Sequence, residues 1–209
     1  MEDEAVASLA LHVVISPILI QLEDDDRNIA AVQTLRSAFK KAERNNPGLT
    51  QSFVAGILES EGISLDVSET LLRLACHDRE FYLTRQEPEF VALNQKAQNL
   101  KNILSLIPDQ IKDRSRFLQT IKDIASAIRE LLEALNEVMK KHQGTIPKLR
   151  ECKKAFENHK RIFVKSSKSF SDTLKRYFRE EQSDSVYVSA NRLINQTNTL
   201  LAFFLSMDS

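Results

Sequence analysis

Tryptophan is missing from this 209-residue sequence, and glycine (four residues), proline (five) and cysteine (two) are scarce. That composition favours helices in a globular protein over disorder. Two cysteines are too few for a disulfide framework and suit a reducing cytosol. The 29 basic and 29 acidic residues cancel, which argues against a dedicated nucleic-acid-binding protein.

Catalytic motifs are absent as well. The sequence contains no glycine-rich phosphate loop, no G-x-S-x-G, no CxxC and no HExxH. Cys152 and His159 lie seven residues apart and offer only two metal ligands, so we interpret them as residues at the edge of a core. Cys76 and His77 are adjacent, and neighbouring side chains on a helix diverge by about 100°. The sequence therefore predicts no enzyme, no cofactor and no metal site.

The longest apolar run, residues 6–20, contains His12 and Pro17 and is short of the about 20 apolar residues that a membrane span needs. The first residues, MEDEA, are acidic where a secretory signal would be basic. We expect a buried helix in an intracellular, cytoplasmic protein.

The clearest helical pattern covers residues 108–142, which contain no proline after Pro108. Apolar residues recur there at steps of three and four: Leu118, Ile121, Ala125, Ile128, Leu132, Leu135 and Met139. A second line lies beside the first: Phe117, Ile124, Leu131 and Val138. The combined stripe is too broad for a two-stranded coiled coil and suits the interior of a helical bundle.

Helical patterns cover most of the remaining chain, and no alternating strand pattern exceeds a few residues. The expected helices are residues 4–22, 27–44, a short helix ending near Gly62, 67–84, 89–106, 148–179 and 185–206. The last four of the eight helices should form an antiparallel four-helix bundle. The first four amount to only about 80 residues with an excess of apolar surface, which favours pairing with another chain.

We therefore predict an all-α protein with two domains. The polar stretch RQEPEF contains Pro88, whose predecessor avoids helical angles. It is the expected linker at residues 85–90, between an N-terminal helical domain at residues 1–84 and a C-terminal bundle at residues 91–209.

Basic residues form two lines on the bundle. Lys122 and Arg129 share a face of one helix, and Lys168 and Lys175 share a face of the next. If these helices are neighbours, the two lines flank a groove with a floor of four residues: Ala125, Ile128, Val164 and Ser171. Such a groove would suit an amphipathic helix with acidic flanks.

Two other interpretations remain open at this point. In the first, these cations are ordinary solvated charges, with Asp172 pairing Lys168 and Lys175 at helical spacing. In the second, residues 148–179 bind an anionic membrane surface, because they contain eleven basic and only three acidic residues. Each basic residue near such a surface contributes about 1 kcal/mol of binding free energy.

Several blocks of sequence resemble the programmed cell death protein 10 (cerebral cavernous malformation 3) family. They are RFLQTIKDIASAI (116–128), KSFSDTLK (168–175), VSANRLI (188–194), NNPGLTQ (45–51) and EPEF (87–90). The resemblance extends from about Leu19 to Phe203, whereas the first eighteen residues and the turn near Gly144 depart from it.

The resemblance implies an adaptor with an N-terminal dimerisation domain and a C-terminal bundle similar to a focal-adhesion-targeting domain. It implies a homodimer, or a heterodimer with germinal-centre kinases of the third subgroup. The matching interface positions are Leu35, Ala38, Ile57 and Leu58. The implied location is the cytoplasm, with peripheral association with the Golgi and the cell membrane.

For the bundle, the resemblance implies binding of leucine- and aspartate-rich helical motifs from paxillin and the cavernous malformation 2 scaffold. It also implies contact with striatin assemblies and binding of phosphoinositide. The implied groove cations are Lys122, Arg129, Lys168 and Lys175, and Arg129 stands where the family usually has lysine. Periodicity and resemblance thus select the same four residues, which favours the groove over solvated charge.

Overall fold

The structure is a computed structural model that describes residues 9–23, 26–46, 48–77, 80–144 and 146–207. Within these ranges the regular elements are all helical and no strand occurs, which confirms the predicted all-α fold. No helix in the same ranges is both long and apolar enough to cross a membrane.

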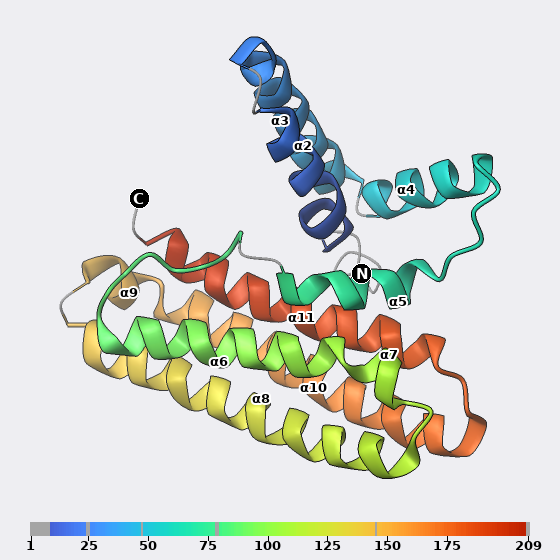
Figure 1. The fold of residues 1–209 in the computed structure, drawn as a ribbon. Coiled ribbons are helices and arrows are strands. Elements are labelled where there is room, and N and C mark those ends of the chain that lie inside the picture. Colours follow the sequence, from blue (N-terminus) through green and yellow to red (C-terminus); the bar gives the residue numbers. More distant parts are fainter. Residues whose placement is uncertain (1–8, 24–25, 47, 78–79, 145, 208–209) are drawn as a thin grey trace.

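Four antiparallel helices form the C-terminal bundle (Figure 1). They are α6 (Pro88–Ser105), α8 (Arg114–His142), α10 (Lys153–Glu180) and α11 (Asp184–Leu205). The helix α6 lies closely against α8, and α10 lies closely against α11, while α6 also contacts α11. Side chains from all four helices meet in one core cluster, so the predicted four-helix bundle is confirmed.

The two apolar lines of α8 have different environments. The second line is the buried one, because Phe117, Ile124 and Leu131 are at most 2% exposed. The first line is buried only toward the C-terminal end of α8. Leu118 and Ala125 are exposed and Ile128 is half-buried, whereas Leu135 and Met139 are buried in the core. The second line therefore belongs to the core along its whole length, and the first joins the core only in the last turns of the helix.

Two of the expected long helices begin later than predicted. A short helix, α7 (Ile107–Gln110), precedes α8, and the Asp113 carboxylate accepts hydrogen bonds from the Ser115 and Arg116 N–H groups at 3.0 and 3.1 Å. These bonds begin a new helix at Arg114, as expected for an aspartate N-cap. Similarly, α9 (Pro147–Glu151) ends before α10 begins at Lys153.

The N-terminal helices stand above the bundle (Figure 1). They are η1 (Leu11–Ile15), α2 (Ser16–Leu22), η2 (Asp26–Asn28), α3 (Ile29–Asn45) and α4 (Leu49–Ser60). The kink expected at Pro17 takes the form of a π-helical turn, in which the Ser16 N–H bonds to the Leu11 carbonyl. Only four buried residues form a separate apolar cluster there: Leu11, Ile15, Leu19 and Val32.

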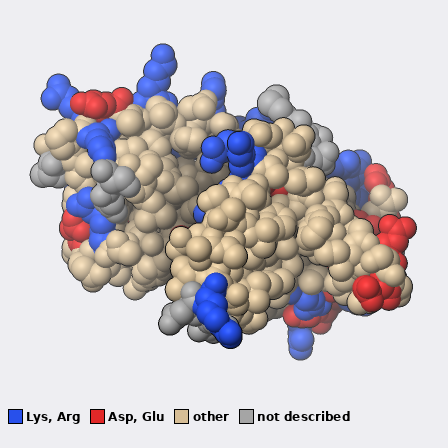
Figure 2. Space-filling model, turned by 90° about the horizontal axis from the view of Figure 1, so that it is seen from above, with Lys and Arg blue, Asp and Glu red and all other residues tan. Residues whose placement is uncertain are grey.

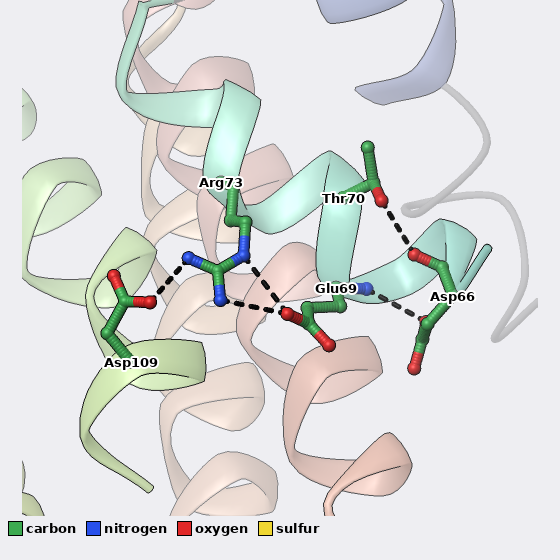
Figure 3. A network of polar contacts seen from close by, with 5 residues as sticks. All are labelled: Asp66, Glu69, Thr70, Arg73 and Asp109. Carbon is green, nitrogen blue, oxygen red and sulfur yellow. Dashed lines mark hydrogen bonds and ion pairs between the residues drawn. The ribbon is translucent and has the colours of Figure 1, made fainter.

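The helix α5 (Val67–Leu74) lies across the bundle and packs on α11 and α6. It ends ten residues earlier than predicted and continues only as the 3₁₀ turn η3 (Ala75–His77). The Asp66 carboxylate caps it by accepting a hydrogen bond from the Glu69 N–H at 2.9 Å, as the capping-box spacing predicts. On the solvent side, the Arg73 guanidinium joins Glu69 at 2.9 Å and Asp109 of α7 at 2.6 Å (Figure 3).

Candidate functional site

The eight predicted groove residues lie on the flanks of α8 and α10 that face each other. We call this surface the α8/α10 face; it consists of Lys122, Ala125, Ile128 and Arg129 from α8, and Val164, Lys168, Ser171 and Lys175 from α10. The contacts between the two helices show how these flanks are oriented.

On α8, the orientation follows from Asn136. Its side-chain oxygen accepts a hydrogen bond from Lys160 Nζ of α10 at 3.2 Å. Asn136 lies seven residues after Arg129 and fourteen after Lys122, and residues at this spacing share a helix face. The basic line of α8 is therefore on the side turned toward α10.

On α10, the orientation follows from Phe178. Its ring centroid lies 5.8 Å from that of Phe117 on α8. Phe178 comes seven residues after Ser171 and fourteen after Val164, so these residues are on the flank turned toward α8.

The same two contacts establish the register. Phe117 is level with Phe178, and Asn136 is level with Lys160. Because the helices are antiparallel, Lys122 then lies between the levels of Ser171 and Lys175. Arg129 lies between the levels of Val164 and Lys168. The four cations thus form two pairs, one at each end of a short apolar surface.

Burial divides the α8/α10 face into a floor and two rims. Ile128 and Val164 are half-buried, and Ile128 packs against the core cluster. The small residues Ala125 and Ser171 are exposed. All four cations are exposed, so the surface is apolar at its centre and basic at its edges.

The four cations differ in their polar contacts with neighbouring side chains. Lys175 Nζ lies 2.8 Å from an Asp172 oxygen, and this hydrogen bond lowers the pKa of the Asp172 carboxyl. Arg129 donates a hydrogen bond to Ser126 Oγ at 3.3 Å. Among the residues that the structure describes, Lys122 and Lys168 have no ion-pair partner. The alternative in which Asp172 pairs both lysines is therefore realised only for Lys175.

The predicted interface residues of the N-terminal helices are mostly exposed. Leu35 and Ile57 are each 47% exposed, Ala38 is exposed, and Leu58 is half-buried. Figure 2 shows a broad surface over α2, α3 and α4 with few charged side chains. Among the described residues of the N-terminal helices, only four form a separate buried apolar cluster. The many exposed leucines and isoleucines beside so small a cluster indicate a surface for a partner.

Sequence reasoning missed most of this N-terminal surface. Large apolar side chains exposed beyond the four predicted residues are Ile18, Ile20, Leu22, Ile29, Leu49, Phe53, Ile63 and Leu65. The sequence indicated such a surface only through its excess of apolar residues, which is more than a small unit can bury. That excess does not identify which side chains are exposed.

The closest contact between a cysteine and a histidine in the described ranges joins Cys76 Sγ and His77 Nδ1 at 3.2 Å, although adjacent side chains on a helix were expected to diverge. Within the described ranges no group of three or more histidine, cysteine, aspartate and glutamate residues is close enough to hold a metal ion. Cys152 and His159 lie at the core edge, where the His159 ring packs 5.8 Å from that of Phe203.

Comparison with known proteins covers most of the chain. The family model for the programmed cell death protein 10 dimerisation domain matches residues 3–64, and the model for the C-terminal domain of the same family matches residues 65–157. The two matches meet just before α5, the helix that packs on the bundle. The expected linker at residues 85–90 stays a prediction.

A curated relative covers still more of the chain. The programmed cell death protein 10 homolog of Caenorhabditis elegans is 34% identical over 194 residues, which is 90% of this chain and 86% of the relative. The dimerisation domain supports self-association, and the family supports an adaptor role. These matches confirm the resemblance seen in the sequence: the chain belongs to the programmed cell death protein 10 family.

Proposed function

We propose that the chain is a non-enzymatic adaptor that joins two partners through two separate surfaces. The α8/α10 face binds an amphipathic helix with an apolar stripe and acidic flanks. The exposed apolar surface of α2, α3 and α4 forms a dimer. The observation that carries the proposal is that Lys122 is nearly level with Lys175, and Arg129 with Lys168, beside the half-buried side chains of Ile128 and Val164.

The α8/α10 face fits a helix better than an extended strand. Both its walls are helices, and no unpaired strand edge occurs in the described ranges, so a ligand has no backbone groups to pair with. An amphipathic helix satisfies its own backbone and contributes only side chains. The proposed ligands are leucine- and aspartate-rich motifs of the kind found in paxillin and in the cavernous malformation 2 scaffold, and striatin assemblies are further proposed partners.

The N-terminal surface is proposed to pair either with a second copy or with the tail of a germinal-centre kinase of the third subgroup. Leu35, Ala38, Ile57 and Leu58 are the proposed contacts. Because the surface carries few charges (Figure 2), this association should depend on buried apolar area and respond weakly to salt.

The test of the α8/α10 face uses a labelled synthetic helical peptide with leucines at positions 1, 5 and 8 and aspartates on the flanks. Fluorescence anisotropy measures its affinity for the full chain. Ala125→Asp should weaken binding at least tenfold, because a carboxylate on the floor repels the acidic flanks and loses hydration under the ligand. The control Asn99→Asp makes a similar change on the exposed side of α6 and should leave the affinity within about twofold. Equal affinity of Ala125→Asp and the unmodified chain would overturn the proposal.

A second candidate is binding to an anionic lipid surface, which the exposed cations Lys148, Lys153, Lys154 and Lys165 favour. Vesicles of phosphatidylcholine with phosphatidylserine or a phosphoinositide separate the two functions. Lys153→Gln with Lys154→Gln should reduce vesicle binding and spare peptide binding, whereas Ala125→Asp should do the reverse. Loss of vesicle binding together with unchanged peptide binding in Ala125→Asp would favour the lipid function.

A further inference from the structure

Two large apolar side chains remain exposed just beyond the α8/α10 face. Leu118 is 43% exposed and Phe178 is 39% exposed. Leu118 lies seven residues before Ala125, and Phe178 lies seven residues after Ser171, so each continues the line of its own helix that forms the floor. We call these two residues the end patch.

The two residues of the end patch lie at one level of the bundle. Phe117, the neighbour of Leu118, touches both Tyr177 and Phe178, with ring centroids 5.5 and 5.8 Å apart. Arg114 lies one helical turn before Leu118 on the same side of α8, and its guanidinium is 6.0 Å from the centroid of the Phe178 ring. The Phe178 ring is therefore turned toward the flank of α8 that carries Leu118.

The charges around the end patch are mostly basic. Arg114, Lys122 and Lys175 lie within one or two turns of it along α8 and α10, and all three are exposed. Two nearby acids are engaged, since Asp172 pairs with Lys175 and Asp113 caps α8 and lies 3.4 Å from Arg116. Glu180 and Glu181 at the end of α10 are exposed, but the basic residues around the patch outnumber them. An exposed apolar patch with a basic surround suits an apolar side chain that an acidic segment carries.

We propose that the end patch is an additional anchoring subsite of the α8/α10 face, occupied by a large apolar residue of an acidic amphipathic partner helix. This inference rests on the proposed function and names the length and pattern of the ligand. From Ile128 to Leu118 is ten residues, or about 15 Å along α8. A ligand helix must therefore present a further leucine about eleven positions from the first. In a motif with leucines at positions 1, 5 and 8 this is position 12, one helical turn after position 8 and one heptad after position 5.

Two synthetic peptides of equal length test the subsite. Both carry leucines at positions 1, 5 and 8 with aspartates on the flanks, and they differ only at position 12, which is leucine in one and alanine in the other. For the unmodified chain we expect the leucine peptide to bind about tenfold more tightly, because partial burial of one leucine has that effect on a dissociation constant. Anisotropy titrations at one salt concentration measure both affinities.

Leu118→Ser should remove the difference between the two peptides while leaving the affinity of the alanine peptide unchanged. Phe178→Ala should have the same effect. The matched controls are Leu106→Ser and Ile162→Ser, because Leu106 (44%) and Ile162 (38%) are equally exposed but belong to other surfaces. Both controls should keep the tenfold difference, and thermal melting should show that all four variants fold.

The outcomes separate the subsite from the proposed function. If the two peptides bind equally to the unmodified chain and Ala125→Asp weakens the binding of both, the subsite is refuted. The proposed binding of a helix to the α8/α10 face is then still supported. If Ala125→Asp weakens neither, or neither peptide binds at all, the α8/α10 face is refuted and the subsite with it. If Leu118→Ser instead lowers the sedimentation coefficient of the chain alone, the patch contacts a second copy, and this also overturns the inference.

Discussion

Glu43 of α3 is a buried acid that holds the neighbouring helix in place. It is 6% exposed, and its carboxylate accepts hydrogen bonds from the Thr50 N–H at 2.8 Å, the Thr50 hydroxyl at 2.6 Å and the Gly48 N–H at 3.1 Å. These donors belong to the first turn of α4, where N–H groups have no partner inside the helix. The N-cap position of α4 is Gly48, which has no side chain, so the carboxylate of the preceding helix accepts these hydrogen bonds instead.

Glu43→Ala should lower the free energy of unfolding by about 2–4 kcal/mol, because it leaves the buried Thr50 N–H without an acceptor. Urea denaturation measures the change. Glu59→Ala, at an exposed position of α4, is the control and should change stability by no more than about 0.5 kcal/mol. An unfolding midpoint unaffected by Glu43→Ala would show that water replaces the lost acceptor.

Glu80 links the N-terminal helices to the segment that follows η3. One carboxylate oxygen lies 2.6 Å from His12 Nδ1 and the other 3.2 Å from Lys40 Nζ of α3. The hydrogen bond from His12 is the main cause that lowers the pKa of the Glu80 carboxyl from 4.5 to about 2. A carboxyl with a lowered pKa stabilises the fold when it is ionised.

The contribution of Glu80 should therefore be complete above pH 4.5 and disappear as the pH falls toward 2. Glu80→Gln should cost about 1 kcal/mol at pH 7, after allowance for solvent screening of a partly exposed pair. Urea denaturation at pH 7, 4.5, 3 and 2 should show the two proteins converging in stability as the pH falls. A difference that stays constant down to pH 2 would rule out the ionised carboxylate as its source.

At the scale of elements, α5 illustrates how the bundle holds a helix too short to be stable alone. Leu71, Leu72 and Ala75 of this segment are at most 1% exposed and belong to the bundle core. Amide side chains of the bundle also bind its backbone: Asn191 donates to the Ser68 carbonyl at 2.8 Å, and Gln98 donates to the Cys76 carbonyl at 2.7 Å.

Asn94 of α6 completes this series by bonding to both backbone groups of Leu83. Its side-chain oxygen accepts from the Leu83 N–H at 3.0 Å, and its nitrogen donates to the Leu83 carbonyl at 2.8 Å. Asn94→Ala should destabilise the chain by about 2–3 kcal/mol, because both groups are buried. Hydrogen exchange at Leu83 should accelerate, whereas Gln95→Ala, at the exposed neighbouring position, should leave it unchanged. Unaltered protection at Leu83 would mean that Asn94 does not hold this segment.

At the scale of the whole molecule, the apolar content is distributed unequally. The bundle encloses one large cluster, to which Leu9, Ala10 and Val13 also contribute from the start of the chain. The cluster of the N-terminal helices contains four buried residues. Most of the other leucines and isoleucines in these helices are exposed. This imbalance is expected of a unit that completes its core by association.

Leu35→Asp and Ile57→Asp should each convert a dimer into a monomer in sedimentation velocity. The unmodified side chains are exposed in the single chain, so the substitutions spare its fold, but an aspartate buried at the interface costs several kcal/mol. Leu58→Asp should act in the same direction, although Leu58 is half-buried and its replacement also disturbs the monomer. Leu106→Asp on the bundle is the control. A dimer that survives Leu35→Asp and Ile57→Asp would place the interface elsewhere.

Particular residues show how far the sequence alone could be interpreted. The 3.6-residue period predicted a helical bundle. Phe156, Phe163 and Phe170, which follow one another at intervals of seven residues, lie in its core and are each at most 2% exposed. The period could not decide which apolar line of α8 is buried, since Phe117 and Leu118 are adjacent and equally suited to a core. That choice depends on the direction from which α6 and α10 approach.

The sequence by itself determined that the chain is helical, that its later helices form a bundle, and that two lines of cations lie on two consecutive long helices. These properties follow from spacing along one helix, which is local. Only the tertiary structure decided that Asp113 rather than Pro108 begins α8, that α5 docks on α11, and that Leu118 and Phe178 lie level at the end of the α8/α10 face. Those properties depend on the register and contacts between helices distant in sequence, and periodicity within one helix contains no information about register.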